Sequence, residues 1–179
     1  METFADYVLA EEDFDKKVEI VWYLQKKMDI FFDHTSVFKA MVADWFVRNM
    51  NIDVDRNLVV TAALLCACKK VDIAQSLDKI RGYAKESAEF LATLGFSQRF
   101  CKICEEQNRY SGSNPRERES DVLELADQFG GMLLPRPERP AFPIEEALVL
   151  LEYRNLKGKN NIYLEQFKEF IEAAKEVFV

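Results

Sequence analysis

The chain has 179 residues, of which 49% are hydrophobic and 14 are phenylalanine, and its formal net charge is −7. This length suits one well-packed domain, residues 1–179, and is too short for two ordinary ones. The acidic balance argues against the basic face that binds nucleic acids and anionic membranes, so we expect neither as a partner. Residues 1–15 are acidic and lack the basic start of a signal peptide, and no apolar run is long enough to span a membrane, which predicts a cytoplasmic protein.

Apolar residues recur at helical spacing along the chain, and no segment shows the alternation typical of strands. The pattern predicts a first helix over about residues 13–33, followed by a second helix that Thr35 or Ser36 can cap. Asp55 can cap a third helix, Leu58–Cys68, which has little polar face and should lie buried at the centre. A short linker helix is expected over Ile73–Ile80.

The second half of the chain continues the helical pattern, with two irregular stretches. The expected elements are Ala84–Leu94 closed by Gly95, Phe100–Asn108 capped by Ser97, a loop over Tyr110–Pro115, Glu119–Leu134, a proline-rich stretch over Pro135–Pro140, a helix opened by Pro143, and a last helix over about residues 162–178. Together these elements predict an all-α bundle of about seven to nine helices, in which residues 34–155 form the core.

The segment Asn57–Lys70, NLVVTAALLCACKK, resembles the signature helix of HD-type phosphohydrolases, in which an adjacent His and Asp hold the catalytic metals. Cys66 and Ala67 stand at the positions of that pair. Further segments resemble the HD-GYP branch in the same order: His34, Tyr83–Leu91, Cys104–Pro115, Val122–Gly130 and Arg136–Leu148. The resemblance implies an HD-domain-like helical fold and a role in bacterial signalling.

The resemblance also implies where the ancestral metal site lies: His34, Cys66, Ala67, Glu105, Glu106 and Asp127. Of the family's metal ligands only His34 and Asp127 survive, and two ligands cannot hold a divalent ion against water. Without a positioned metal, the activated water and the Lewis acid of the family's hydrolysis are lost. We therefore expect a pseudoenzyme with no catalytic residue and no cofactor, in which His34 is a relic that hydrogen-bonds Asp127.

Three functions remain open on these grounds. The first is a regulatory or scaffolding module that binds another protein or a second copy of itself, with part of the aromatic surface of the first helix (Trp22, Tyr23, Phe31 and Phe32) in the interface. The second is a sensor that binds a nucleotide or cyclic dinucleotide without cleaving it, through a cationic rim of Lys69, Lys70 and Arg109, extended by Arg116 and Arg118.

The third function is a phosphohydrolase with a rebuilt, zinc-preferring metal site on His34, Cys66, Cys104, Glu105 and Asp127. A site made only of the four cysteines is excluded by helix geometry. Cys66 and Cys68 are two residues apart on one helix and point about 200° away from each other.

Overall fold

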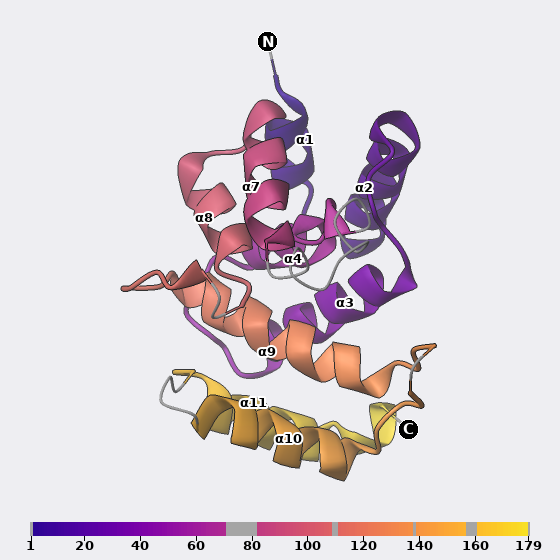
Figure 1. Cartoon of the computed structure of the whole chain (residues 1–179), viewed down its shortest axis with the longest axis vertical. Coiled ribbons are helices and arrows are strands. Elements are labelled where there is room, and N and C mark those ends of the chain that lie inside the picture. The colour runs from indigo at the N-terminus through magenta and orange to yellow at the C-terminus, as the bar shows by residue number, and fades with distance from the viewer. Residues whose placement is uncertain (1, 71–81, 109–110, 138, 157–160, 179) are drawn as a thin grey trace.

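The computed structural model describes residues 2–70, 82–108, 111–137, 139–156 and 161–178, and it confirms the predicted all-α class (Figure 1). These ranges contain nine α-helices and no strand; one isolated bridge joins Arg136 to Arg139. The predicted linker helix over residues 73–80 lies outside them. The helices are α1 (Phe4–Ala10), α2 (Phe14–Met28), α3 (His34–Asn49), α4 (Arg56–Leu65), α7 (Tyr83–Thr93), α8 (Gln98–Glu105), α9 (Arg118–Leu133), α10 (Ile144–Leu156) and α11 (Leu164–Ala173), followed by the 3-10 helix η2 (Lys175–Val177).

The short helix α1 was not predicted from the apolar spacing. It begins with a capping box, in which the Thr3 hydroxyl accepts from the Asp6 N–H and the Asp6 carboxylate accepts from the Thr3 N–H. Lys17 of α2 links α1 to α4. The buried Lys17 ammonium donates to the Val8 carbonyl at 2.8 Å and to the Thr61 hydroxyl of α4 at 3.0 Å. Burial, aided by the charge of a nearby arginine, lowers the pKa of Lys17 to about 8.

Several predicted helix ends are confirmed, and the ends around residue 30 are corrected. The side chains of Asp55 and Ser97 cap α4 and α8, as expected. Helix α2 stops at Met28 because Asp29 takes a left-handed conformation with φ of 50°. Helix α3 is capped by Asp33 rather than by Thr35 or Ser36, since the Asp33 carboxylate accepts from the backbone N–H groups of both residues.

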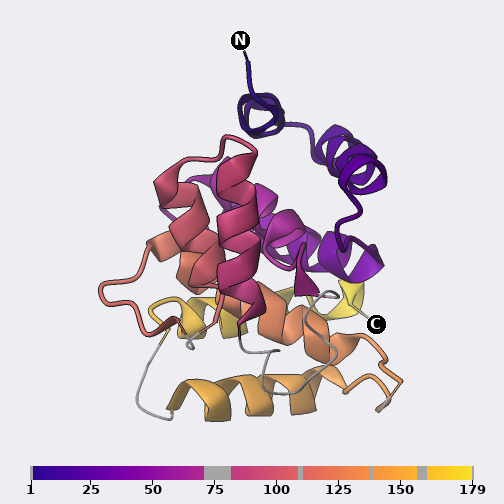
Figure 2. The ribbon, with the colours of Figure 1, turned by 45° about the horizontal axis from the view of Figure 1, so that its top comes forward.

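Two apolar clusters form the core, on opposite sides of a middle layer made of α3, α4 and α9 (Figures 1 and 2). The first fills the space between α4 and the helices α1, α2, α7 and α8. The second joins α3 and α9 to α10 and α11, where the rings of Phe46 and Phe129 pack against Phe167 at centroid distances of 5.0 and 5.5 Å. Every residue from Val59 to Leu65 is buried, so α4 is the central helix that its composition predicted.

Candidate functional site

Helix α4 packs against α3, α8 and α9 in the middle of the molecule, and Cys66 follows its last residue. The Cys66 thiol donates to Gln107 Oε1 at 3.2 Å, and the Gln107 amide donates back to the Cys66 carbonyl at 2.9 Å. The Tyr83 hydroxyl donates to the same Oε1 at 3.3 Å. Burial, reinforced by the Asp127 carboxylate, raises the pKa of Cys66, so the sulfur is a neutral thiol in this environment.

Asp127 lies on α9 and forms an ion pair with Lys39 of α3. The distance from Lys39 Nζ to Asp127 Oδ1 is 2.6 Å, and the two side chains are 12% and 22% exposed. Burial opposes the charge of Lys39, but the Asp127 carboxylate outweighs burial and raises the pKa of the ammonium. An ammonium group therefore stands beside the one carboxylate that the family resemblance assigns to metal binding.

Two adjacent glycines of α9 make room for this lysine. A Cβ atom on Gly130 would lie 2.9 Å from Lys39 Cγ, and a Cβ on Gly131 would lie 3.0 Å from an Nη atom of Arg136. Both distances are shorter than ordinary van der Waals contacts, so larger residues would push the cationic side chains away from the helix. Glycine weakens a helix interior, and the close approach of Lys39 and Arg136 explains why two occur here.

A cavity of about 190 Å³ opens beside the ion pair, between the start of α3 and the segment that follows α9. Three cationic side chains contribute to its lining, from Lys39, Lys70 and Arg136, together with the polar side chains of Asp33 and Thr35. Burial and the nearby Lys39 ammonium lower the pKa of Lys70. Burial is the larger cause of this shift, and three cationic groups around one cavity make it a candidate site for an anion.

Other predicted site residues lie elsewhere. His34 is exposed in the first turn of α3, and the predicted hydrogen bond to Asp127 does not form, because Lys39 takes that position. Cys104 is buried in the first apolar cluster with Cys66, where burial raises its pKa. Ala67 is half-buried.

Glu105 and Glu106 turn away from each other. Glu105 contributes to a polar groove between α7 and α8. Glu106 is buried and accepts from the hydroxyls of Ser113 at 2.6 Å and Ser120 at 2.8 Å, and from the Glu117 N–H at 2.8 Å. The Glu106 carboxylate therefore stabilises the segment between α8 and α9, and it does not form a common site with Cys66 and Asp127.

The predicted cationic rim is divided among several environments. Lys69 lies over the Phe90 ring, with Nζ 4.6 Å from the ring centroid, while Lys70 borders the cavity described above. Arg116 is half-buried and forms ion pairs with Asp121 and Glu124, and Arg118 is exposed beside Asp53. Arg109 lies outside the described residues. Of the rim residues that are described, Lys70 alone lines the cationic cavity.

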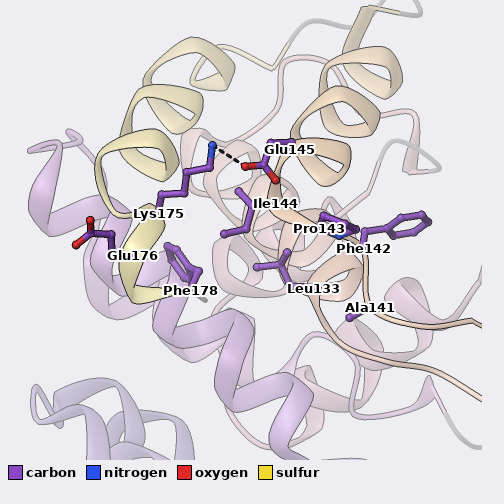
Figure 3. A pocket seen from close by; sticks show the side chains of 9 residues that line it. All are labelled: Leu133, Ala141, Phe142, Pro143, Ile144, Glu145, Lys175, Glu176 and Phe178. Atoms are coloured by element: carbon purple, nitrogen blue, oxygen red, sulfur yellow. Dashed lines mark ion pairs between the residues drawn. The ribbon is translucent and has the colours of Figure 1, made fainter.

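A second hollow, of about 570 Å³, lies between the end of α9, the start of α10 and η2 (Figure 3). Its lining is mostly apolar, with Leu133, Ile144 and Phe178 pointing into it, and the ion pair between Lys175 and Glu145 crosses its rim at 2.8 Å. The lining has no histidine, cysteine or hydroxyl group, and its mostly apolar surface can hold an apolar group.

Sequence reasoning missed Lys39, Arg136 and Gln107 as parts of the site. One signal was present: the Gly130-Gly131 pair inside a predicted helix indicates the close approach of another group. The identity of that group could not be read from the chain, because Lys39 and Asp127 are 88 positions apart in sequence.

Within the described residues, no group of three or more histidine, cysteine, aspartate or glutamate side chains is arranged to hold a metal ion. In the same residues, no helix combines the length and apolar character needed to cross a bilayer. Comparison of the chain with protein-family models, with curated proteins and with solved structures found no match.

Proposed function

We propose that this chain is a non-catalytic, HD-like helical domain that acts through binding, as a regulatory or scaffolding module. One observation supports the proposal most directly: the Lys39 ammonium forms an ion pair with the Asp127 carboxylate, with Nζ 2.6 Å from Oδ1. A cation that is part of the chain takes the position where a hydrolase of this type would use a metal. An ammonium neutralises a carboxylate, but it has no open coordination position at which to activate water.

The neighbouring polar groups support the same conclusion, because each is occupied by another group of the chain. Cys66 is a neutral thiol bonded to Gln107, and Glu106 holds the segment before α9. His34 is exposed, and within the described residues no carboxylate is hydrogen-bonded to its imidazole to orient it as a general base. The geometry therefore favours a stable binding scaffold over a hydrolytic centre.

Hydrolysis and metal content of the purified full chain test this proposal. We expect no sustained turnover of cyclic dinucleotides or of a generic phosphodiester with added manganese, iron or zinc. Protein prepared without chelators or a histidine tag should contain less than about 0.2 metal ions per chain. Sustained turnover, or a stoichiometric metal that is lost in the Asp127→Asn variant, would contradict the proposal.

A second function, the binding of a phosphorylated small molecule without hydrolysis, is favoured by the cationic cavity. Lys39, Lys70 and Arg136 surround a space of about 190 Å³, which accommodates a phosphoryl or carboxylate group. Charge-assisted hydrogen bonds from ammonium and guanidinium groups are the usual means of holding such anions.

Calorimetric titration with inorganic phosphate and a nucleotide panel tests this second function. We expect saturable binding that the Lys70→Met variant weakens about 10- to 100-fold, because one charge-assisted contact is lost. The exposed Lys85→Met variant is the control and should leave the affinity unchanged. The pKa of Lys70 is lowered, so its ammonium loses its proton at a lower pH than an ordinary lysine does. The affinity for the anion should therefore fall as the pH rises, and the fall should begin below the pH at which an ordinary lysine titrates. If the titrations show no saturable heat of binding, the second function is contradicted and only the regulatory or scaffolding function remains.

A further inference from the structure

The outer face of α2 combines exposed aromatic rings with ordered charges. Trp22 and Tyr23 are 49% and 61% exposed, although large aromatic side chains are usually buried. Lys26 Nζ lies 3.7 Å from the centroid of the Trp22 ring, so the lysine is held along the helix surface. Figures 1 and 2 show α2 at the edge of the molecule.

The charges on this face change sign along the helix. Residues 16, 19, 23 and 26 are spaced three, four and three apart, so they form one stripe on a helix, and all four are exposed. Trp22 flanks the stripe, and Asp29 follows at the end of the helix. Read from one end to the other, the side chains are Lys16, Glu19, the two aromatic rings, Lys26 and Asp29, and Lys27 lies beside them with its Nζ 5.5 Å from the centroid of the Tyr23 ring.

This order is self-complementary when the helix is paired with a copy of itself in the opposite direction. If a two-fold axis passes between Trp22 and Tyr23, position 19 faces position 26 of the second copy, and position 16 faces position 29. Each of these pairs joins a carboxylate to an ammonium, and the aromatic rings of the two copies meet at the centre. A parallel arrangement would place identical charges side by side and would be repulsive.

We propose that α2 forms an antiparallel pair with α2 of a second copy, giving a symmetric homodimer. The contact is isologous, so each charge pair occurs twice around the axis. Aromatic residues at the centre and charged residues at the rim are the usual composition of a protein interface. The pairing does not depend on whether the interior binds a ligand, so it can fail while the proposed function stands, and the reverse is also true.

Sedimentation velocity of the full chain over a range of concentrations tests the dimer. A contact made mainly by one helix lies at the small end of specific interfaces, and we expect a dissociation constant on the order of 10 µM. Glu19→Lys places an ammonium opposite Lys26 twice, and Lys26→Glu places a carboxylate opposite Glu19 twice. Each variant should weaken the dimer about tenfold or more.

Combining the two substitutions provides the decisive measurement. The chain that carries both E19K and K26E restores opposite charges at every pair and should dimerise within about threefold of the natural chain. A mixture of the two single variants should form heterodimers, although neither variant pairs with itself, because each supplies the charges that the other lacks. Exposed Glu146 offers a matched control for Glu19→Lys, since Glu146→Lys changes the net charge by the same amount and should leave the dimer unchanged.

All the substituted side chains are exposed, so circular dichroism should show the same helical content and the same melting temperature for each variant measured as a monomer. A natural chain that stays monomeric at about 200 µM, well above the expected dissociation constant, would overturn the proposal. So would a dimer that is indifferent to Glu19→Lys and Lys26→Glu, because it would use another surface.

Discussion

Replacement of Arg116 by methionine is expected to reduce the free energy of unfolding by about 3–5 kcal/mol. The Arg116 side chain is 10% exposed, and its guanidinium lies 2.9 Å from Asp121 Oδ1 and 3.0 Å from Glu124 Oε2. The two carboxylates are 8% and 1% exposed. Removal of the cation takes from both largely buried carboxylates the guanidinium that pairs with them, while methionine preserves most of the aliphatic stem.

Urea unfolding at neutral pH, followed by circular dichroism, measures this loss. Arg118→Met provides a matched control in the same segment, because Arg118 is 63% exposed and its partner Asp53 is 98% exposed. An exposed ion pair contributes little, so the control should lose less than about 0.5 kcal/mol. Equal losses in the two variants would show that the Arg116 cluster does not stabilise the start of α9.

The helix pattern of this chain could be predicted well from local sequence, and its errors have local causes. Asp55 and Ser97 precede apolar runs and cap their helices as expected, because a cap needs only the next three residues. The sequence Asp33-His-Thr-Ser36 offers three residues that can cap, and apolar spacing does not choose among them. Helix α1 was missed because only seven residues form it, too few for a periodic pattern, although its Thr3–Asp6 capping box was readable.

The interior of the candidate site could not be predicted in the same way. The family resemblance placed Cys66 at a ligand position but gave Tyr83 and Gln107 no role in the site, and the structure brings these three side chains together by hydrogen bonds. Nothing local to Lys39 indicates that its ammonium reaches Asp127, since that contact depends on how α3 crosses α9. Charges at helical spacing can be read from sequence, but long-range ion pairs require the packing of the helices.

Lys39→Met is expected to reduce the free energy of unfolding by about 2–3 kcal/mol, which is below the range for a fully buried pair because water can reach Asp127. The ion pair joins α3 to α9 at 2.6 Å, and its side chains are 12% and 22% exposed. Methionine retains the stem that packs on Gly130, so the loss reports mainly on the charge. Asp127 would then face the thiol of Cys66 without the cation that neutralises it.

A double-mutant cycle with Asp127→Asn separates the ion pair from the packing of the stem. We expect a coupling energy of about 1–3 kcal/mol between Lys39 and Asp127, measured by urea unfolding of the two single variants and the double variant. A coupling below about 0.3 kcal/mol would mean that Asp127 does not depend on Lys39. The proposed loss of catalysis would then lose its main support, because a carboxylate without a committed ammonium remains open to a divalent metal.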